Sequence, residues 1–161
     1  QLMGSGSILR EVIAAANILS EDFGVQADVW SCPSFNELKR DGDDCVRWNL
    51  MHPDQKPRIP HVTACLEKHA GPVVAATDYV KLFADQIRAY VGRNYHVLGT
   101  DGFGRSDTRA SLRRHFEVNR YYVTVAALKT LADEGTIPAK TVKSAIRKYK
   151  LDPEKPNPLN V

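Results

Sequence analysis

The stretch Gly71-Pro72-Val73-Val74-Ala75-Ala76-Thr77-Asp78 decides the fold class of this chain. Residues 73–77 form an apolar run without polar alternation, which is typical of a strand that is buried on both faces. Asp78 is expected to cap a helix with apolar residues at positions 80, 83, 87 and 91, and a second strand is expected at residues 95–100. A strand, a helix and a strand in succession indicate parallel strands.

The pattern continues on the amino-terminal side. Apolar residues at positions 8, 12, 15, 16, 19 and 23 follow the spacing of a helix, which Gly24 ends. Residues 25–32 alternate as a strand. Only three residues precede the turn at residues 4–7, so we expect a shortened strand there and interpret the chain as a fragment of a longer protein.

The middle of the chain is less regular. Ser34 and Glu37 have the spacing of a capping box and open a short helix. Residues 41–44 are expected to break that helix, and residues 45–51 to form another. Three prolines within residues 52–60 predict an extended loop. Residues 62–66 fit either a strand or a helix.

The carboxy-terminal part reads as a loop at residues 101–107, three helices at 108–116, 120–134 and 139–150, and an extended proline-rich tail. Because strands and helices alternate through short turns, we predict a three-layer α/β/α fold in which a mostly parallel sheet carries helices on both faces.

Composition excludes several classes of protein. The 161 residues fit one domain, and 43% hydrophobic with 25% charged residues is usual for a globular chain. No apolar run approaches the roughly 18 residues of a membrane span, and residues 1–7 do not resemble a secretory signal. Three cysteines without C-x-x-C spacing favour buried thiols in a reducing cytoplasm. The three are Cys32, Cys45 and Cys65.

Charge is unevenly distributed. Residues 1–80 hold 7 basic and 11 acidic side chains, a balance of −4, and residues 81–161 hold 15 and 8, a balance of +7. The basic half could meet an acidic partner. A nucleic-acid partner is not expected, because acids are interleaved with the bases and aromatic stacking platforms are missing.

The turn Gly4-Ser5-Gly6-Ser7 before a helix could hold a phosphate, as in a stand-alone flavodoxin-like nucleotide-binding module. The third glycine of the dinucleotide pattern is replaced by the bulky Leu9. A tight turn between strand and helix is therefore the favoured interpretation, and the binding module is the alternative.

The loop at residues 101–107 is the candidate functional segment, because it follows a predicted strand at the edge where open α/β sheets place their sites. We interpret it as a contact with another domain or subunit, although Ser106 or Asp107 could simply cap the next helix. The candidate interface residues are Asp101, Gly102, Phe103, Arg105, Ser106 and Asp107.

No catalytic, cofactor-binding or metal-binding residues are predicted in this chain. Residues 113–115 (Arg-Arg-His) are adjacent on a helix and should point in different directions. The remaining histidines lack the spacing of metal ligands, and no side chain lies in a recognisable nucleophile motif. These histidines are His52, His61, His69 and His96.

Three motifs, at residues 41–53, 77–84 and 98–107, resemble the homodimeric, bacterial-type pyruvate dehydrogenase decarboxylating component. The ending Asn157-Pro158-Leu159 is also similar, so the resemblance covers the whole chain. It departs from the usual pattern at Cys32-Pro33 and at His61, outside the three motifs.

The resemblance implies that residues 1–161 are the carboxy-terminal, transketolase-type domain, with a sheet of about five strands. It implies a longer parent enzyme whose other domains bind thiamine diphosphate and Mg²⁺, decarboxylate pyruvate and acetylate lipoyl groups. The implied partners are those domains, a second identical subunit and the dihydrolipoyl acetyltransferase core. The family's cofactor motif, an acid-bearing G-D-G followed by Asn, is absent here, so we expect this chain to be structural and inactive alone.

Overall fold

A computed structural model describes residues 1–161. Four parallel strands form one sheet in the order β2-β1-β3-β4, with Leu2 opposite both Val29 and Val74. The predicted parallel α/β fold is confirmed, with four strands where about five were expected. The strands are β1 (Leu2–Gly4), β2 (Val29–Ser31), β3 (Val73–Ala76) and β4 (Tyr95–Leu98).

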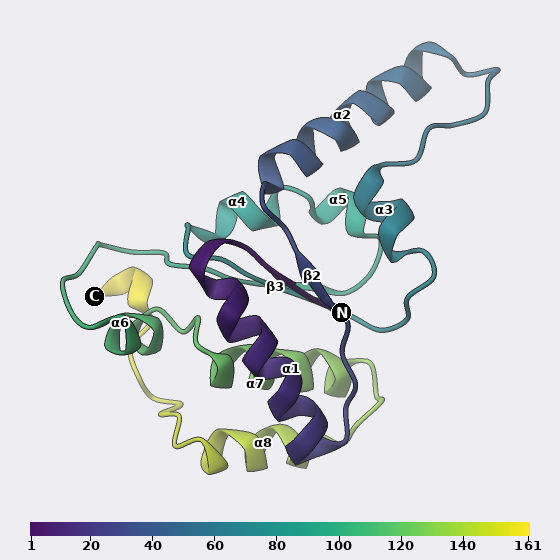
Figure 1. Cartoon of the computed structure of the whole chain (residues 1–161). Helices are drawn as coiled ribbons and strands as arrows, with labels where there is room; N and C mark the ends of the chain where they lie inside the picture. The colour runs from purple at the N-terminus through teal and green to yellow at the C-terminus, as the bar shows by residue number, and fades with distance from the viewer.

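Helices cover both faces of the sheet (Figure 1). Helices α1 (Leu9–Phe23), α7 (Arg120–Asp133) and α8 (Ala139–Lys148) lie on one face. The other face carries α2 (Phe35–Met51), α3 (His61–Leu66), α4 (Lys81–Asp85) and α5 (Arg88–Val91). The short α6 (Arg109–His115) and two 3₁₀ turns, η1 (Gly6–Ile8) and η2 (Pro158–Asn160), complete the fold.

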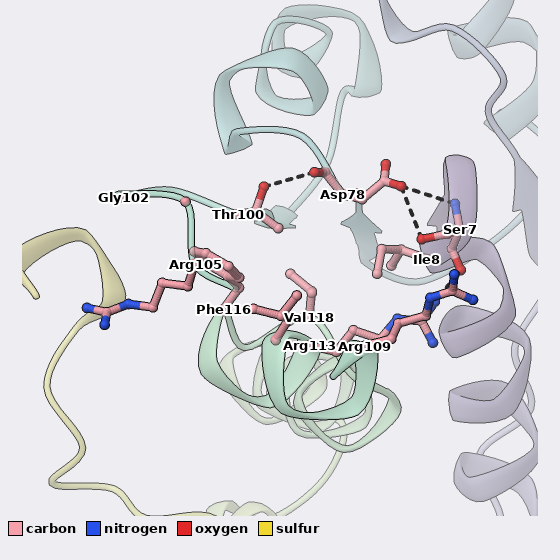
Figure 2. A pocket seen from close by; sticks show the side chains of 12 residues that line it. Ser7, Ile8, Asp78, Thr100, Gly102, Arg105, Arg109, Arg113, Phe116 and Val118 are labelled. Carbon is pink, nitrogen blue, oxygen red and sulfur yellow. Dashed lines mark hydrogen bonds between the residues drawn. The ribbon is translucent and has the colours of Figure 1, made fainter. Parts of the chain in front are cut away.

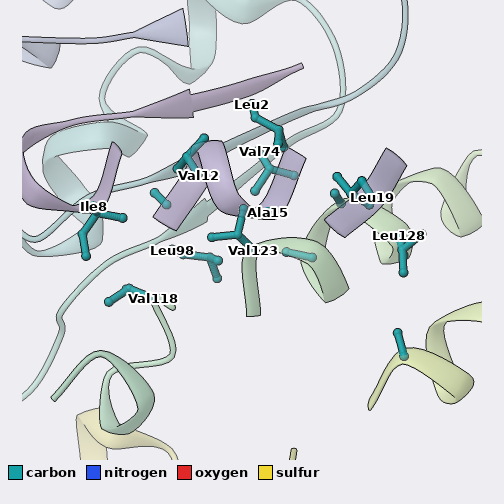
Figure 3. Packing of buried hydrophobic residues seen from close by; sticks show 14 of the residues in the cluster. Leu2, Ile8, Val12, Ala15, Leu19, Val74, Leu98, Val118, Val123 and Leu128 are labelled. Carbon is teal, nitrogen blue, oxygen red and sulfur yellow. The ribbon is translucent and has the colours of Figure 1, made fainter. Parts of the chain in front are cut away.

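The central strands β1 and β3 supply both hydrophobic cores. Leu2 and Val74 point into a cluster shared with α1, α7 and α8, part of which is drawn in Figure 3. Their neighbours Met3 and Val73 point into the cluster on the opposite face. Every residue of β3 is buried, as its unbroken apolar run predicted.

Helix α2 corrects one prediction. Residues 41–44 do not break it, and it runs without interruption to Met51 and projects from the body of the molecule (Figure 1). The helix continues because Gly42 lies against the ring of Tyr90, and because Asp43 accepts a hydrogen bond from the Tyr90 hydroxyl. This tertiary contact outweighs the roughly 1 kcal/mol that glycine costs inside a helix.

The segment between β3 and β4 corrects a second prediction. It forms two short helices instead of one, separated at Ile87, whose fully buried side chain packs into the second core. Asp78 caps neither helix, because its carboxylate binds Ser7 instead. Residues 62–66, for which strand and helix were both open, are helical and belong to α3.

The other helix boundaries agree closely with the sequence, whereas one strand is much shorter than expected. Gly24 ends α1 with a φ of 65°, and Ser34 caps α2 by accepting a hydrogen bond from the Glu37 N–H at 3.2 Å. The strand expected at residues 25–32 is shorter, at residues 29–31. None of the helices has the length and apolar character required to cross a membrane.

Candidate functional site

The carboxyl ends of β1, β3 and β4 meet at one edge of the sheet, where their loops and α6 border an open pocket of about 390 Å³ (Figure 2). Open α/β sheets place their sites at this edge. Its floor is apolar, with Ile8, Leu112, Phe116 and Val118. The side chains with polar groups that line it are Ser7, Asp78, Thr100, Arg105, Arg109 and Arg113.

Asp78 closes the turn that sequence analysis considered for phosphate. Its Oδ2 accepts hydrogen bonds from the N–H and the hydroxyl of Ser7 at 3.2 and 3.1 Å. Gly6 has a φ of +53°, and a Cβ added there would lie 2.7 Å from Asp78 Oδ1. A carboxylate of this chain therefore occupies the place where a phosphate would bind, which supports the tight-turn interpretation over the nucleotide-binding module.

The loop at residues 101–107 is fastened at its start. Asp101 Oδ1 accepts a hydrogen bond from the Lys81 N–H at 2.8 Å, and the Thr100 N–H donates to the Tyr79 carbonyl at 2.8 Å. Gly102, with a φ of +104°, lies so close to the carboxy-terminal segment that an added Cβ would be 2.4 Å from the Pro158 carbonyl oxygen. The loops after β3 and β4 thus form one connected surface with the end of the chain.

The rest of the loop faces solvent. Phe103 is 81% exposed, and Ser106 is exposed without a side-chain hydrogen bond. Asp107 Oδ1 accepts a hydrogen bond from the Thr108 N–H at 2.6 Å. The cap of α6 is Thr108, whose hydroxyl oxygen accepts from the Ser111 N–H, so neither of the two predicted capping residues has that role.

Glu11 organises the wall behind the pocket, and sequence analysis did not single it out. Its buried carboxylate accepts hydrogen bonds from Arg113 Nη1 at 2.9 Å and from the backbone N–H, Nε and Nη2 of Arg120 at 2.9, 3.0 and 3.1 Å. Burial opposes ionisation, but the hydrogen bonds and charges of Arg120 and Arg113 outweigh it and hold the pKa of Glu11 below its ordinary value. The sequence could have indicated Glu11, because it is an acidic residue on the apolar side of the helix that became α1.

The cationic run on α6 is not one site, as predicted. Arg113 points to Glu11 and to the Ser7 carbonyl, whereas Arg114 donates to the Lys150 carbonyl. His115 Nε2 is buried without a hydrogen-bond partner. Burial, with the charges of Arg105 and Lys155, lowers the pKa of His115.

The cysteines are buried or half-buried, as predicted. Burial raises the pKa of the Cys32 thiol to about 11. The structure also shows a pair that sequence analysis missed, with Cys65 Sγ 3.4 Å from His61 Nε2 on α3. The two are four residues apart, so a helical assignment of this segment would have placed them on one face. No three His, Cys, Asp or Glu side chains are grouped to hold a metal ion.

Comparison with known families identifies the fold. The sequence model of the transketolase-like TK C-terminal domain matches residues 1–119. This chain belongs to the transketolase-like C-terminal domain family. The transketolase-type domain that the resemblance implied is therefore confirmed. The parallel sheet with a pocket at its carboxyl edge is the structure of a member of this family.

Several proteins that are similar to this chain over its whole length are named pyruvate dehydrogenase E1 components. The protein of Cupriavidus necator is 62% identical over 161 residues, which are 100% of this chain and 18% of that protein. The proteins of Pseudomonas aeruginosa and Escherichia coli K12 are 60% and 56% identical over 99% and 98% of this chain, again 18% of each relative. The chain thus spans less than a fifth of the length of these relatives.

Proposed function

We propose that residues 1–161 are the carboxy-terminal domain of a pyruvate dehydrogenase E1 component. The observation that carries this proposal is similarity along the entire chain to proteins of that name, of which it spans 18%. The longer protein would decarboxylate pyruvate with thiamine diphosphate and Mg²⁺ and transfer the two-carbon unit to a lipoyl group. Its expected location is the bacterial cytoplasm.

Within that enzyme the domain has a structural role. Its residues do not fit a thiamine diphosphate and Mg²⁺ site, because the carboxylate of Asp101 in the edge loop binds Lys81 and Asp78 binds Ser7. Mg²⁺ is usually held by one or two carboxylates together with phosphate oxygens, and both carboxylates at this edge already accept hydrogen bonds from the chain. The chemistry therefore belongs to the parts of the enzyme outside these residues.

The surface formed by the loops after β3 and β4 is the proposed contact with those parts and with a second subunit. Tyr79 and Phe103 are exposed on these loops. Leu82 and Phe83 are exposed on the adjoining α4, and the ring centroid of Phe83 lies 5.4 Å from that of Tyr79. Gathered apolar side chains at the surface usually mark a contact with another protein surface. The acetyltransferase core is a further proposed partner of the whole enzyme, without an assigned surface in this chain.

The test uses the longer protein with Phe103→Ser and Asp107→Ala. Losing an aromatic anchor of an interface costs on the order of 1–2 kcal/mol, so the dimer dissociation constant should rise about tenfold or more. Lys143→Ala, on the exposed side of α8, is the matched control and should leave it unchanged. If the double variant sediments like the parent protein and the complex keeps its activity, these loops do not form the contact.

A further inference from the structure

The pocket at the carboxyl edge carries positive charge that the chain does not neutralise. Three arginines and one aspartate line it, and Glu11 behind the wall pairs with one of the arginines, Arg113. The aspartate, Asp78, already accepts two hydrogen bonds from Ser7. Arg105 and Arg109 form no ion pair and no side-chain hydrogen bond, although both are within reach of the pocket.

Arg109 and Arg113 form the centre of this charge. They are four residues apart on α6, so they lie on one face of the helix, and like charges at this spacing repel each other. Glu11 neutralises Arg113, but the same carboxylate also serves Arg120, with four hydrogen bonds in all. Arg109 forms no ion pair and has no acidic partner of its own.

The arrangement of the walls indicates the kind of ligand. Figure 2 shows Arg109 and Arg113 on the side of Ser7, whereas the guanidinium of Arg105 points away from Asp78 at the outer rim. The floor between them is apolar and includes Leu112 and Phe116. A volume of about 390 Å³ is in the range of small-molecule sites, in which an apolar lining and a few convergent polar groups are usual.

We propose that this pocket binds a small organic oxyanion, a phosphate or carboxylate group on a short apolar body. The oxyanion lies between Arg109 and the free N–H groups of Arg113, because guanidinium forks match the geometry of phosphate and carboxylate oxygens. The apolar body covers Leu112 and Phe116, and Arg105 lies at the outer rim, where its charge adds to the positive field of the pocket. The pocket shares Gly102 and Arg105 with the proposed contact surface, so it must remain open in the longer enzyme for a ligand to bind there.

The probes are phenyl phosphate and inorganic phosphate, titrated calorimetrically at constant chloride into the 161-residue chain. Phenyl phosphate should bind more tightly than inorganic phosphate, because only the former covers the apolar floor. Arg109→Gln should weaken phenyl phosphate about tenfold, as expected for the loss of one charge-assisted hydrogen bond. Arg105→Gln should weaken it by a smaller factor.

Arg147→Gln is the matched control, since this arginine is exposed on α8 and forms no ion pair. It should leave both affinities unchanged, and circular dichroism should show all variants folded. If the control and Arg109→Gln lost the same amount of affinity for phenyl phosphate, binding would depend on the overall surface charge, and the proposal would be overturned. Binding by the chain but not by the longer protein would overturn it as well, because the pocket would then be a contact between domains.

Discussion

Replacing Glu11 by Gln should destabilise the fold more than any other single loss of charge on α1. The amide has the shape of the carboxylate, but its NH₂ group faces the donors of Arg113 and Arg120 and its charge is gone. Removing one partner of a buried ion pair costs about 3–5 kcal/mol. Because the Arg120 side chain is 43% exposed and water can solvate it, we expect the lower end of that range.

A loss of about 3 kcal/mol corresponds to a fall in Tm of roughly 6–12 °C for a chain of this length. Thermal and urea unfolding followed by circular dichroism measure it, with Glu21→Gln on the exposed side of α1 as the control. The control should stay within about 0.5 kcal/mol of the parent chain. A loss below about 1 kcal/mol for Glu11→Gln would refute the view that this carboxylate joins α1 to α6 and α7.

The same residue predicts how the loss depends on pH. The pKa of Glu11 in the folded chain is below its ordinary value of 4.5, so its stabilisation is present above pH 4.5 and is lost as the pH falls through the folded pKa. The difference in unfolding free energy between the parent chain and Glu11→Gln should therefore be complete at neutral pH and shrink in acid. A difference that grows on acidification would contradict the assigned sign.

The remaining predictions concern α2 and the thiols. Gly42→Ala would normally stabilise a helix by about 1 kcal/mol. Here it should lower Tm, because the added Cβ would lie 2.3 Å from the Tyr90 ring. A rise in Tm would show that the ring can move aside without cost. Ser34→Ala should cost about 1 kcal/mol of unfolding free energy in urea titrations, and no change would mean that the cap is dispensable. Iodoacetamide at pH 8 should alkylate Cys65 before Cys32, because the Cys32 thiol is buried and has a pKa of about 11. Mass spectrometry of the modified chain measures the order of reaction. Faster reaction at Cys32 would contradict its burial.

The elements that could be predicted from the sequence depend on local patterns. The unbroken apolar run of β3 and the regularly spaced apolar residues of α1 indicate from the sequence alone which residues are buried. The capping residue Ser34 and the stop at Gly24 are likewise local, since each acts within one helical turn. Such features need no knowledge of distant neighbours.

The elements that were missed depend on partners far along the chain. Gly42 stays helical because of Tyr90, and Asp78 binds Ser7 71 residues away instead of capping the next helix. Glu11 finds its arginines more than 100 residues later. Spacing alone cannot reveal which distant segments meet, so the pocket and its charge became visible only in three dimensions.

The most direct test of the account is carbon dioxide release from pyruvate in the presence of thiamine diphosphate and Mg²⁺. We expect none above background from the 161-residue chain, and sustained release from a protein in which the chain is joined to the parts that its relatives carry in addition. Turnover by the chain alone would contradict the assignment of a structural domain whose chemistry lies elsewhere.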